Sequence, residues 1–403
     1  MNLRDVYIVD AVRTPIGRYK GALKSVRPDD LAAIVIKAII ERNGYLNHED
    51  IEEVVLGNAN GAGEENRNVA RMATLLAGLP IEVGGTTINR LCGSGLDAIN
   101  YAARAIMVNE GDVFIAGGTE SMTRAPFVMA KPDIDFPRGN MELYDTTIGW
   151  RFINPLIEEK FGVDSMPETA ENVAQRFGIT REEQDEFAYQ SQMKAKEAME
   201  SGKLKDEIIP VEVKDRKGNV TIVDTDEHPR PTTNLEKLSK LKPLFPNGTI
   251  TAGNASGIND GASVLLLMSG EKVKEYGINP LAKYVTSAVA GLEPAIMGLG
   301  PIYATRKALQ RASLDINDIG LVELNEAFAS QSIECIKQLE LNPEIVNVNG
   351  GAIAYGHPLG ASGARILTTL LYEMKRRNVK YGLATMCIGV GQGIATIVEN
   401  VNY

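Results

Sequence analysis

Apolar positions along the chain follow two patterns, one typical of amphipathic helices and the other of buried strands. Residues 31–42 have helical spacing of apolar positions, and the apolar run 54–56 after a short polar loop predicts a strand. The run 262–268 predicts a further buried strand. Because such helices and strands alternate, with glycine-rich turns between them, we expect an α/β fold of parallel sheets covered by helices.

This pattern occurs twice. Residues 31–56 resemble residues 299–324, which lie 268 positions later, and both segments have the order helix, short loop, strand. The same offset relates two further pairs: Ser94-Gly95 with Ser362-Gly363, and residues 113–116 with 381–384. A shared register over several elements predicts two similar βαβ-type halves.

A segment of different composition interrupts the repeat. From about residue 121 the chain is rich in Pro, Met and charge, with a strongly helical stretch over 169–200. We predict a first half formed by residues 1–120 plus 250–272, an inserted loop domain at 121–249 and a second half at 273–403. Long excursions from a rigid scaffold are usually functional, so the insertion is a candidate substrate-binding domain.

Composition and charge narrow the classes of function. The 403 residues are 44% hydrophobic and 23% charged, as in soluble globular proteins, and no leader or apolar run long enough for a membrane span is evident. The net charge of −10 disfavours nucleic acid, although local Lys and Arg can still bind a small anion. Three cysteines and three histidines without metal-ligand spacing predict reduced thiols in the cytoplasm and no metal site.

Cys92 lies at a predicted strand-to-helix turn within residues 88–98, followed by small residues. A helix N-terminus lowers the pKa of a cysteine and favours the nucleophilic thiolate. A buried structural cysteine is the alternative.

His357 lies in the glycine-rich segment 350–363, where it can take a proton from Cys92. Cys387 follows an apolar strand, and the repeat pairs it with Thr119. Loop hydrogen bonding for the histidine and core packing for the cysteine are the alternatives. The positions predict that both cysteines and the histidine meet where the two halves face each other.

Residues 323–329 end a strand and begin a helix, which offers an amide and a carboxylate where ligands of open α/β sheets bind. Asn325 can hold a water that donates to an oxyanion, and helix capping is the alternative. The glycines at 389, 391 and 393 lack the spacing of a dinucleotide-binding loop.

Together the Cys92 turn, the segment 325–328, the loop 356–358 and the ending Cys387-x-Gly389 resemble the four signatures of the thiolase family. The resemblance implies the thiolase fold and an acyl-CoA acyltransferase. It implies that Cys92 is acylated after losing its proton to His357, and that Cys387 is the acid or base for the second substrate. Asn325, through water, and His357 would stabilise one oxyanion, and the amides of Cys92 and Gly389 the other.

The same resemblance implies the ligands and partners. Coenzyme A would be a substrate, held by the loop domain and the segment after it, and no cofactor would be bound. Arg230 and Ser256 are candidates for CoA contacts, while Met166 and Phe328 would line the acyl and pantetheine region. Family members are commonly homodimers or homotetramers, and the resemblance does not choose between them.

Residues 145–155 and 164–172 resemble the 3-oxoadipyl-CoA thiolases of aromatic-compound breakdown, and Ser165 stands where many biosynthetic members have His. We expect cleavage of a 3-oxoacyl-CoA, such as 3-oxoadipyl-CoA, or the reverse condensation. An acetyl-CoA C-acetyltransferase and a non-catalytic acyl-CoA-binding protein are the alternatives. Arg151 is a candidate partner for the distal carboxylate of a dicarboxylic chain, with an ordinary surface arginine as the alternative.

Overall fold

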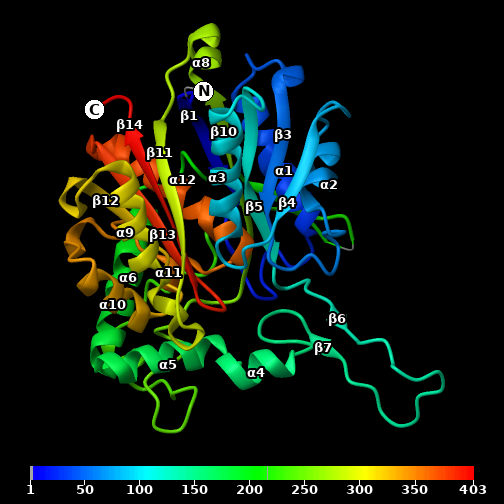
Figure 1. Ribbon diagram of the computed structural model, residues 1–403, viewed down its shortest axis with the longest axis vertical. Coiled ribbons are helices and arrows are strands. Elements are labelled where there is room, and N and C mark those ends of the chain that lie inside the picture. Colours follow the sequence, from blue (N-terminus) through cyan, green and yellow to red (C-terminus); the bar gives the residue numbers. More distant parts are fainter. Residues whose placement is uncertain (1–2, 216) are drawn as a thin grey trace.

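The computed structural model describes residues 3–215 and 217–403 (Figure 1). Its strands are β1 Val6–Arg13, β2 Gly17–Arg18, β3 Ile51–Gly57, β4 Gly84–Ile88, β5 Val113–Ser121, β6 Phe127–Val128, β7 Tyr144–Asp145, β8 Val211–Lys214, β9 Val220–Val223, β10 Asn259–Ser269, β11 Ala282–Gly291, β12 Ile319–Leu324, β13 Tyr381–Ile388 and β14 Gln392–Asn400. Its α-helices are α1 Pro28–Arg42, α2 Val69–Leu76, α3 Ser94–Met107, α4 Pro155–Phe161, α5 Met166–Phe177, α6 Arg181–Glu200, α7 Leu235–Ser239, α8 Gly270–Tyr276, α9 Gly300–Ala312, α10 Ala329–Gln338, α11 Ala352–Tyr355 and α12 Leu359–Arg377.

One sheet contains the strands of both halves, in the order β12-β13-β14-β11-β1-β10-β5-β3-β4. The halves join where β1 pairs with β11. Pairing is parallel between β3 and its neighbours β4 and β5, and between β12 and β13, whereas β10 and β14 run antiparallel to their neighbours. The expectation of parallel sheets is therefore wrong for the inner strands, because β14 returns from β13 through a tight hairpin and β10 returns after the insertion.

The repeat predicted at an offset of 268 residues is confirmed by the elements. Strand β3 begins at Ile51 and β12 at Ile319, while β5 begins at Val113 and β13 at Tyr381. The buried run around residues 262–268 is β10, which is buried along its whole length.

Helices α3 and α12 lie in the middle of the molecule, between the two halves of the sheet. One core cluster joins both helices to the inner faces of β5 and β10 on one side and of β13 and β14 on the other. Helices α1 and α2 cover the outer face of the first half, and α9 and α10 that of the second. This layering buries α12 from Gly360 to Met374, including polar residues such as Ser362, Arg365 and Glu373.

Within the segment between β5 and β10, the elements β6, β7, α4 and α5 lie at the lower end of the molecule as drawn in Figure 1. The helical stretch expected over 169–200 is two helices, because Gly178 ends α5 with a left-handed φ of 67° and Thr180 caps α6 together with Glu183. Strands β6 and β7 begin and end a long hairpin arm that projects from the body (Figure 1). In the part of the chain that is described, no helix is both long and apolar enough to span a bilayer.

Candidate active site

Cys92 lies on the turn between β4 and α3, as the sequence predicts. The amide of Leu91 donates to Asn89 Oδ1 (2.9 Å), the amide of Arg90 donates to Ser94 Oγ (2.9 Å), and that hydroxyl donates to the Leu91 carbonyl (2.6 Å). Leu91 has a φ of 46°, a left-handed conformation that costs a residue with a side chain about 1–2 kcal/mol. The turn thus holds the cysteine backbone in one strained and well-supported geometry.

Burial raises the pKa of the Cys92 thiol to about 11, although a hydrogen bond from the Gly389 amide acts in the opposite direction. The lowering of this pKa that the helix N-terminus predicts is therefore not found, because loss of hydration outweighs the backbone amides. A thiol with this pKa is protonated at neutral pH. A base has to remove its proton before Cys92 can attack an acyl carbon.

The backbone of His357 is held by Asn259. Its amide donates to Asn259 Oδ1 at 3.0 Å, and the amide group of Asn259 donates in turn to the carbonyl of Gly17 at 2.9 Å. Gly356 has a φ of 100°, and a Cβ there would lie 2.2 Å from Asn259 Cγ. The glycine before the histidine is thus required by both the conformation and the space.

The hydrogen bonds of the His357 ring identify its tautomer. Nδ1 lies 2.6 Å from Ser362 Oγ, and this hydroxyl donates its single hydrogen to the Pro358 carbonyl at 3.1 Å. Nδ1 must therefore carry the ring hydrogen and donate it to Ser362. Nε2 is left with its lone pair, and it has no hydrogen-bond partner among the described residues.

Burial, assisted by the positive charge of Arg365, lowers the pKa of His357 to about 3. The imidazole is neutral near pH 7 and its Nε2 can accept a proton. Cys92 and His357 come from different halves, and each lies just before the N-terminal turn of a helix, α3 for Cys92 and α12 for His357. A Cβ on Gly95 of α3 would lie 2.5 Å from the Gly360 carbonyl of α12, so the two helix ends pack backbone to backbone.

Cys387 lies within the end of β13, rather than just after the strand as expected. It is buried in a cluster with Phe328 and Met166. Burial raises the pKa of Cys387 well above its ordinary value, and the neighbouring Cys92 contributes to the shift. Because the Gly389 amide reaches the sulfur of Cys92, the end of β13 lies directly beside the nucleophile.

Asn325 follows β12 and its amide donates to the Thr385 carbonyl of β13 at 3.0 Å. The residue is fully buried, and neither Oδ1 nor Nδ2 of its side chain has a hydrogen-bond partner among the described residues. A buried amide group without protein partners usually binds water or ligand. Both polar atoms of the Asn325 side chain are therefore available to a water or a ligand, and its role in catalysis stays a prediction.

Comparisons with known proteins agree with this geometry over the whole chain. Residues 6–271 match the family described as "Thiolase, N-terminal domain", and residues 278–400 match "Thiolase, C-terminal domain". The chain belongs to the thiolase family. It is an acyltransferase of the kind that acts on acyl-CoA substrates.

Two relatives illustrate how similar the chain is to known thiolases. It is 58% identical to the 3-oxoadipyl-CoA/3-oxo-5,6-dehydrosuberyl-CoA thiolase of Escherichia coli K12, over 99% of this chain and 100% of the relative. It is 54% identical, with the same coverage, to a beta-ketoadipyl-CoA thiolase of Acinetobacter baylyi.

Solved structures confirm the thiolase fold. The crystal structure of the Bacillus anthracis acetyl-CoA acetyltransferase superposes with a TM-score of 0.93 at 43% identity, covering 99% of this chain and 100% of the other. Human mitochondrial 3-ketoacyl-CoA thiolase superposes with a TM-score of 0.92 at 42% identity, covering 100% of both chains.

The four residues predicted to contact CoA and the acyl chain occupy two regions of this thiolase. Met166 and Phe328 share the apolar cluster of Cys387, and Met166 Sδ would lie 3.5 Å from a Cβ on Gly389. The amide of Ser256 donates to the carbonyl of Ala327, next to that cluster. Arg230 is exposed and lies apart from the thiols, where it lines two adjoining grooves of about 450 and 420 Å³.

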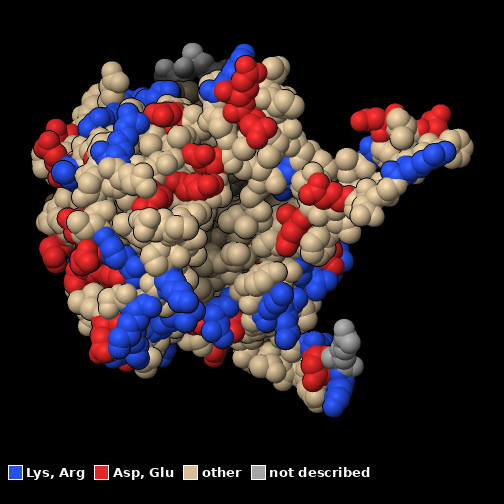
Figure 2. Space-filling model, turned by 90° about the horizontal axis from the view of Figure 1, so that it is seen from below, with Lys and Arg blue, Asp and Glu red and all other residues tan. Residues whose placement is uncertain are grey.

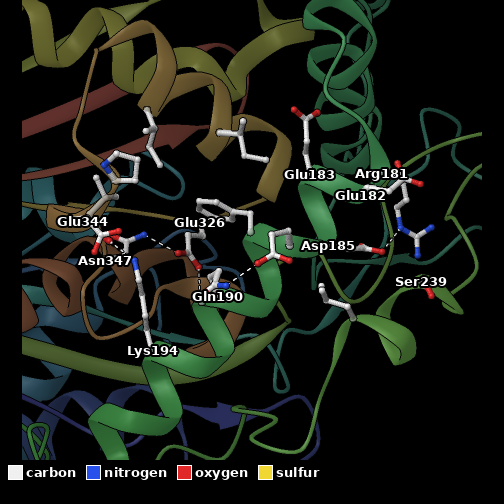
Figure 3. Close-up of a pocket in the computed structure, with 18 residues that line it drawn as sticks. Arg181, Glu182, Glu183, Asp185, Gln190, Lys194, Ser239, Glu326, Glu344 and Asn347 are labelled. Atoms are coloured by element: carbon white, nitrogen blue, oxygen red, sulfur yellow. Dashed lines mark hydrogen bonds and ion pairs between the residues drawn. The ribbon is translucent and has the colours of Figure 1, made fainter.

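Glu326 is a structural residue rather than a ligand-binding carboxylate. Its oxygens accept hydrogen bonds from Ser191 Oγ (2.6 Å), Asn347 Nδ2 (2.8 Å) and the Ile353 amide (3.2 Å). Figure 3 shows Glu326 and Asn347 at a groove of about 820 Å³ lined mainly by α6, α10 and the segment 343–347. The Glu326 oxygens are thus engaged by protein donors, whereas the side chain of the adjacent Asn325 has no hydrogen-bond partner among the described residues.

Two residues of the site were missed by sequence reasoning. Asn259 holds the His357 backbone, and its Nδ2 also lies 3.3 Å from His228 Nδ1. Glu120 accepts hydrogen bonds from the amides of Ala59 (2.8 Å) and Gly360 (2.7 Å), and so connects the first half to the start of α12. Only weak signals in the sequence pointed to these two positions. Asn259 is a polar residue just before the apolar run 262–268, and Glu120 is a polar residue at the end of β5.

Proposed function

We propose that this thiolase cleaves 3-oxoadipyl-CoA with CoA to give succinyl-CoA and acetyl-CoA, through an acyl group carried on Cys92. Three observations support the mechanism: the Cys92 thiol is protonated and lies at the Gly389 amide, the buried thiol of Cys387 neighbours it, and His357 Nε2 has no hydrogen-bond partner among the described residues. The names of the relatives at 54–58% identity support the choice of acyl chain.

In the proposed first half-reaction, His357 Nε2 takes the Cys92 proton as the sulfur attacks the C3 carbonyl of the substrate. The carbonyl oxygen becomes an oxyanion while the new carbon-sulfur bond forms. The bond between C2 and C3 then breaks, and Cys387 protonates the acetyl-CoA carbanion that departs. Amides of Cys92 and Gly389 stabilise one oxyanion, and a water on Asn325 together with His357 stabilises the other.

The second half-reaction transfers the succinyl group to CoA. The Cys387 thiolate takes the CoA proton, and the CoA sulfur attacks the acyl carbon of the thioester. Cys92 departs as a thiolate and recovers its proton from the His357 imidazolium. All groups return to their starting protonation states, and storage of the acyl group predicts ping-pong kinetics.

CoA is a polyanion, and its phosphates need a local cluster of cations. Such a cluster can exist although the net charge of the whole chain is −10. The two grooves around Arg230 also contain Arg18, Lys20 and Lys237. Figure 2 shows a hollow on the face where the insertion lies, with Lys and Arg side chains gathered along one side of it. We place the CoA phosphates at these cations, while the pantetheine arm passes Ser256 and Phe328 toward Cys92.

We also propose a homo-oligomer, a homodimer or homotetramer, that works in the cytoplasm. The arm between β6 and β7 exposes an apolar set that a monomer would leave in water: Phe127, Met129, Ile134, Phe136, Met141 and Leu143. All three cysteines are free, and this chemistry requires reduced thiols.

Intact-protein mass after separate exposure to acetyl-CoA, acetoacetyl-CoA and 3-oxoadipyl-CoA tests the function. We expect a succinyl adduct from 3-oxoadipyl-CoA, mapped to the Cys92 peptide and lost in Cys92→Ser. Faster adduct formation from acetoacetyl-CoA would instead indicate an acetyl-CoA acetyltransferase. Absence of any adduct on the folded protein would indicate a binding protein.

A further inference from the structure

We propose that Arg151 binds the distal carboxylate of the acyl chain and so determines the preference for a dicarboxylic substrate. This inference rests on the proposed function, because it names the residue that recognises the end of the succinyl group. Arg151 is half-buried, and its Nη2 donates to Asn60 Oδ1 at 3.5 Å. It follows Trp150 in the loop between β7 and α4.

One side of this loop is held next to Met166. The indole nitrogen of Trp150 donates to the carbonyl of Asp164 at 3.2 Å, and the Asp164 carboxylate accepts from Asn172 Nδ2 of α5 at 2.8 Å. Asp164 stands two positions before Met166, the residue that packs beside Gly389. Trp150 is thereby fixed to the segment that leads into Met166.

The other side of the loop is held next to the Cys92 turn. Asn60 is buried, its amide donates to Glu120 Oε1 at 3.2 Å, and its Nδ2 donates to Thr146 Oγ1 at 2.9 Å. Since Thr146 engages Nδ2, Oδ1 is the atom of this side chain left to face Arg151. Asn89 of the Cys92 turn donates to the carbonyl of the neighbouring Ala59 at 3.0 Å. Two hydrogen bonds, joined through the adjacent residues Ala59 and Asn60, thus connect the Arg151 guanidinium to the turn that contains Cys92.

Arg151 has a charge that no described residue neutralises. Two other arginines of this region are paired, Arg90 with Asp97 at 2.8 Å and Arg124 with Glu64 at 2.5 Å. Arg151 forms no ion pair within residues 3–215 and 217–403, and its single hydrogen bond to Asn60 leaves the rest of the guanidinium fork available. A half-buried arginine with free donors matches the geometry of a carboxylate.

The length of the succinyl group sets the reach that this placement requires of Arg151. From the Cys92 sulfur to its terminal carboxyl carbon an extended succinyl chain spans about 5 Å, and a charge-assisted hydrogen bond adds about 3 Å. An acetyl group ends at its second carbon and has no distal carboxylate that Arg151 could bind. Arg151 therefore acts on the dicarboxylic chain and leaves short neutral chains unaffected.

The test compares Arg151→Gln with the wild-type enzyme on three substrates: 3-oxoadipyl-CoA, acetoacetyl-CoA and 3-oxohexanoyl-CoA, which has a methyl group in place of the distal carboxylate. We expect kcat/KM for 3-oxoadipyl-CoA to fall by about 10- to 100-fold, the range for a lost charged hydrogen bond, while the two neutral substrates change less than about threefold. Arg151→Lys should recover part of the loss. Arg306→Gln, at an exposed arginine of α9, is the matched control for the change in charge.

The outcomes are distinct. An equal loss on all three substrates would assign Arg151 to positioning of the loop, and no loss on 3-oxoadipyl-CoA would place the carboxylate elsewhere; either result overturns the proposal. If the wild-type enzyme does not cleave 3-oxoadipyl-CoA while it cleaves the neutral substrates, the proposed acyl chain is wrong, and this inference falls with it.

Discussion

The raised pKa of Cys92 makes a quantitative prediction about its reactivity with an alkylating agent. With a pKa of about 11, roughly one thiol in ten thousand is ionised at pH 7, against about one in a hundred at the ordinary pKa of 9.0. The thiolate of a weaker acid is more nucleophilic, by up to about tenfold over this interval. Iodoacetamide should therefore alkylate Cys92 about tenfold more slowly at pH 7 than it alkylates a solvated cysteine.

The pH dependence follows from the same shift. Because the thiolate is the reactive form and its pKa is raised, the alkylation rate should rise about tenfold per pH unit from pH 7 to 10 without a plateau. His357, with a pKa lowered to about 3, stays neutral over that interval and adds no inflection near pH 6.5. The assay is alkylation at a series of pH values, quenched and quantified on the Cys92 peptide.

Peptide mapping separates Cys92 from the buried Cys335 and Cys387, and Cys92→Ser removes the signal. A rate that is already constant between pH 6 and 8 would refute the reasoning. It would mean that the thiol and the imidazole form a stable ion pair, and that burial does not control the ionisation of the nucleophile.

Three further predictions concern the second thiol, the histidine loop and the arm. Cys387→Ala should still be acetylated on Cys92 by acetyl-CoA, because CoA can depart as a thiolate without a proton from Cys387. Condensation should slow by about a hundred- to ten-thousandfold, because the α-carbon proton needs a base, and equal losses in both steps would contradict this role. Gly356→Ala should lower the free energy of unfolding by roughly 2 kcal/mol more than Gly139→Ala. Asn259 blocks a Cβ at position 356, whereas a Cβ at position 139, where φ is a similar 97°, meets nothing within 4 Å. Equal shifts in the thermal unfolding temperatures of the two variants would refute the clash. Phe136→Asp, at a residue 88% exposed on the arm, should reduce the oligomer mass in light scattering, and an unchanged mass would exclude the arm from the interface.

Local patterns in the sequence were sufficient to propose a nucleophile and its base. Cys92 stands between a strand and a run of small residues, and His357 stands among glycines that only a backbone with unusual φ values needs. The constant offset predicted two similar halves, because each half repeats the same order of helix and strand. The turns and the repeated elements depend on residues that are close together in the chain, so the sequence alone is sufficient to predict them.

The organisation of the sheet was beyond local reasoning. Antiparallel pairing of β10 and β14 depends on where the chain returns after the insertion and after the hairpin, and periodicity does not record direction. Only the structure distinguishes the adjacent residues Asn325 and Glu326. The side chain of Asn325 has no hydrogen-bond partner among the described residues, whereas the Glu326 carboxylate accepts a hydrogen bond from Asn347.

What the sequence by itself determined is therefore the fold class, the thiolase resemblance and the positions of Cys92, His357 and Cys387. Only the tertiary structure decided the protonation states, because burial sets the pKa of Cys92 and of His357 and depends on both halves packing around them. It alone placed Asn259 against His357, across 98 residues of chain. Contacts between residues so far apart in the chain result from the packing of whole layers, and local sequence patterns do not predict that packing.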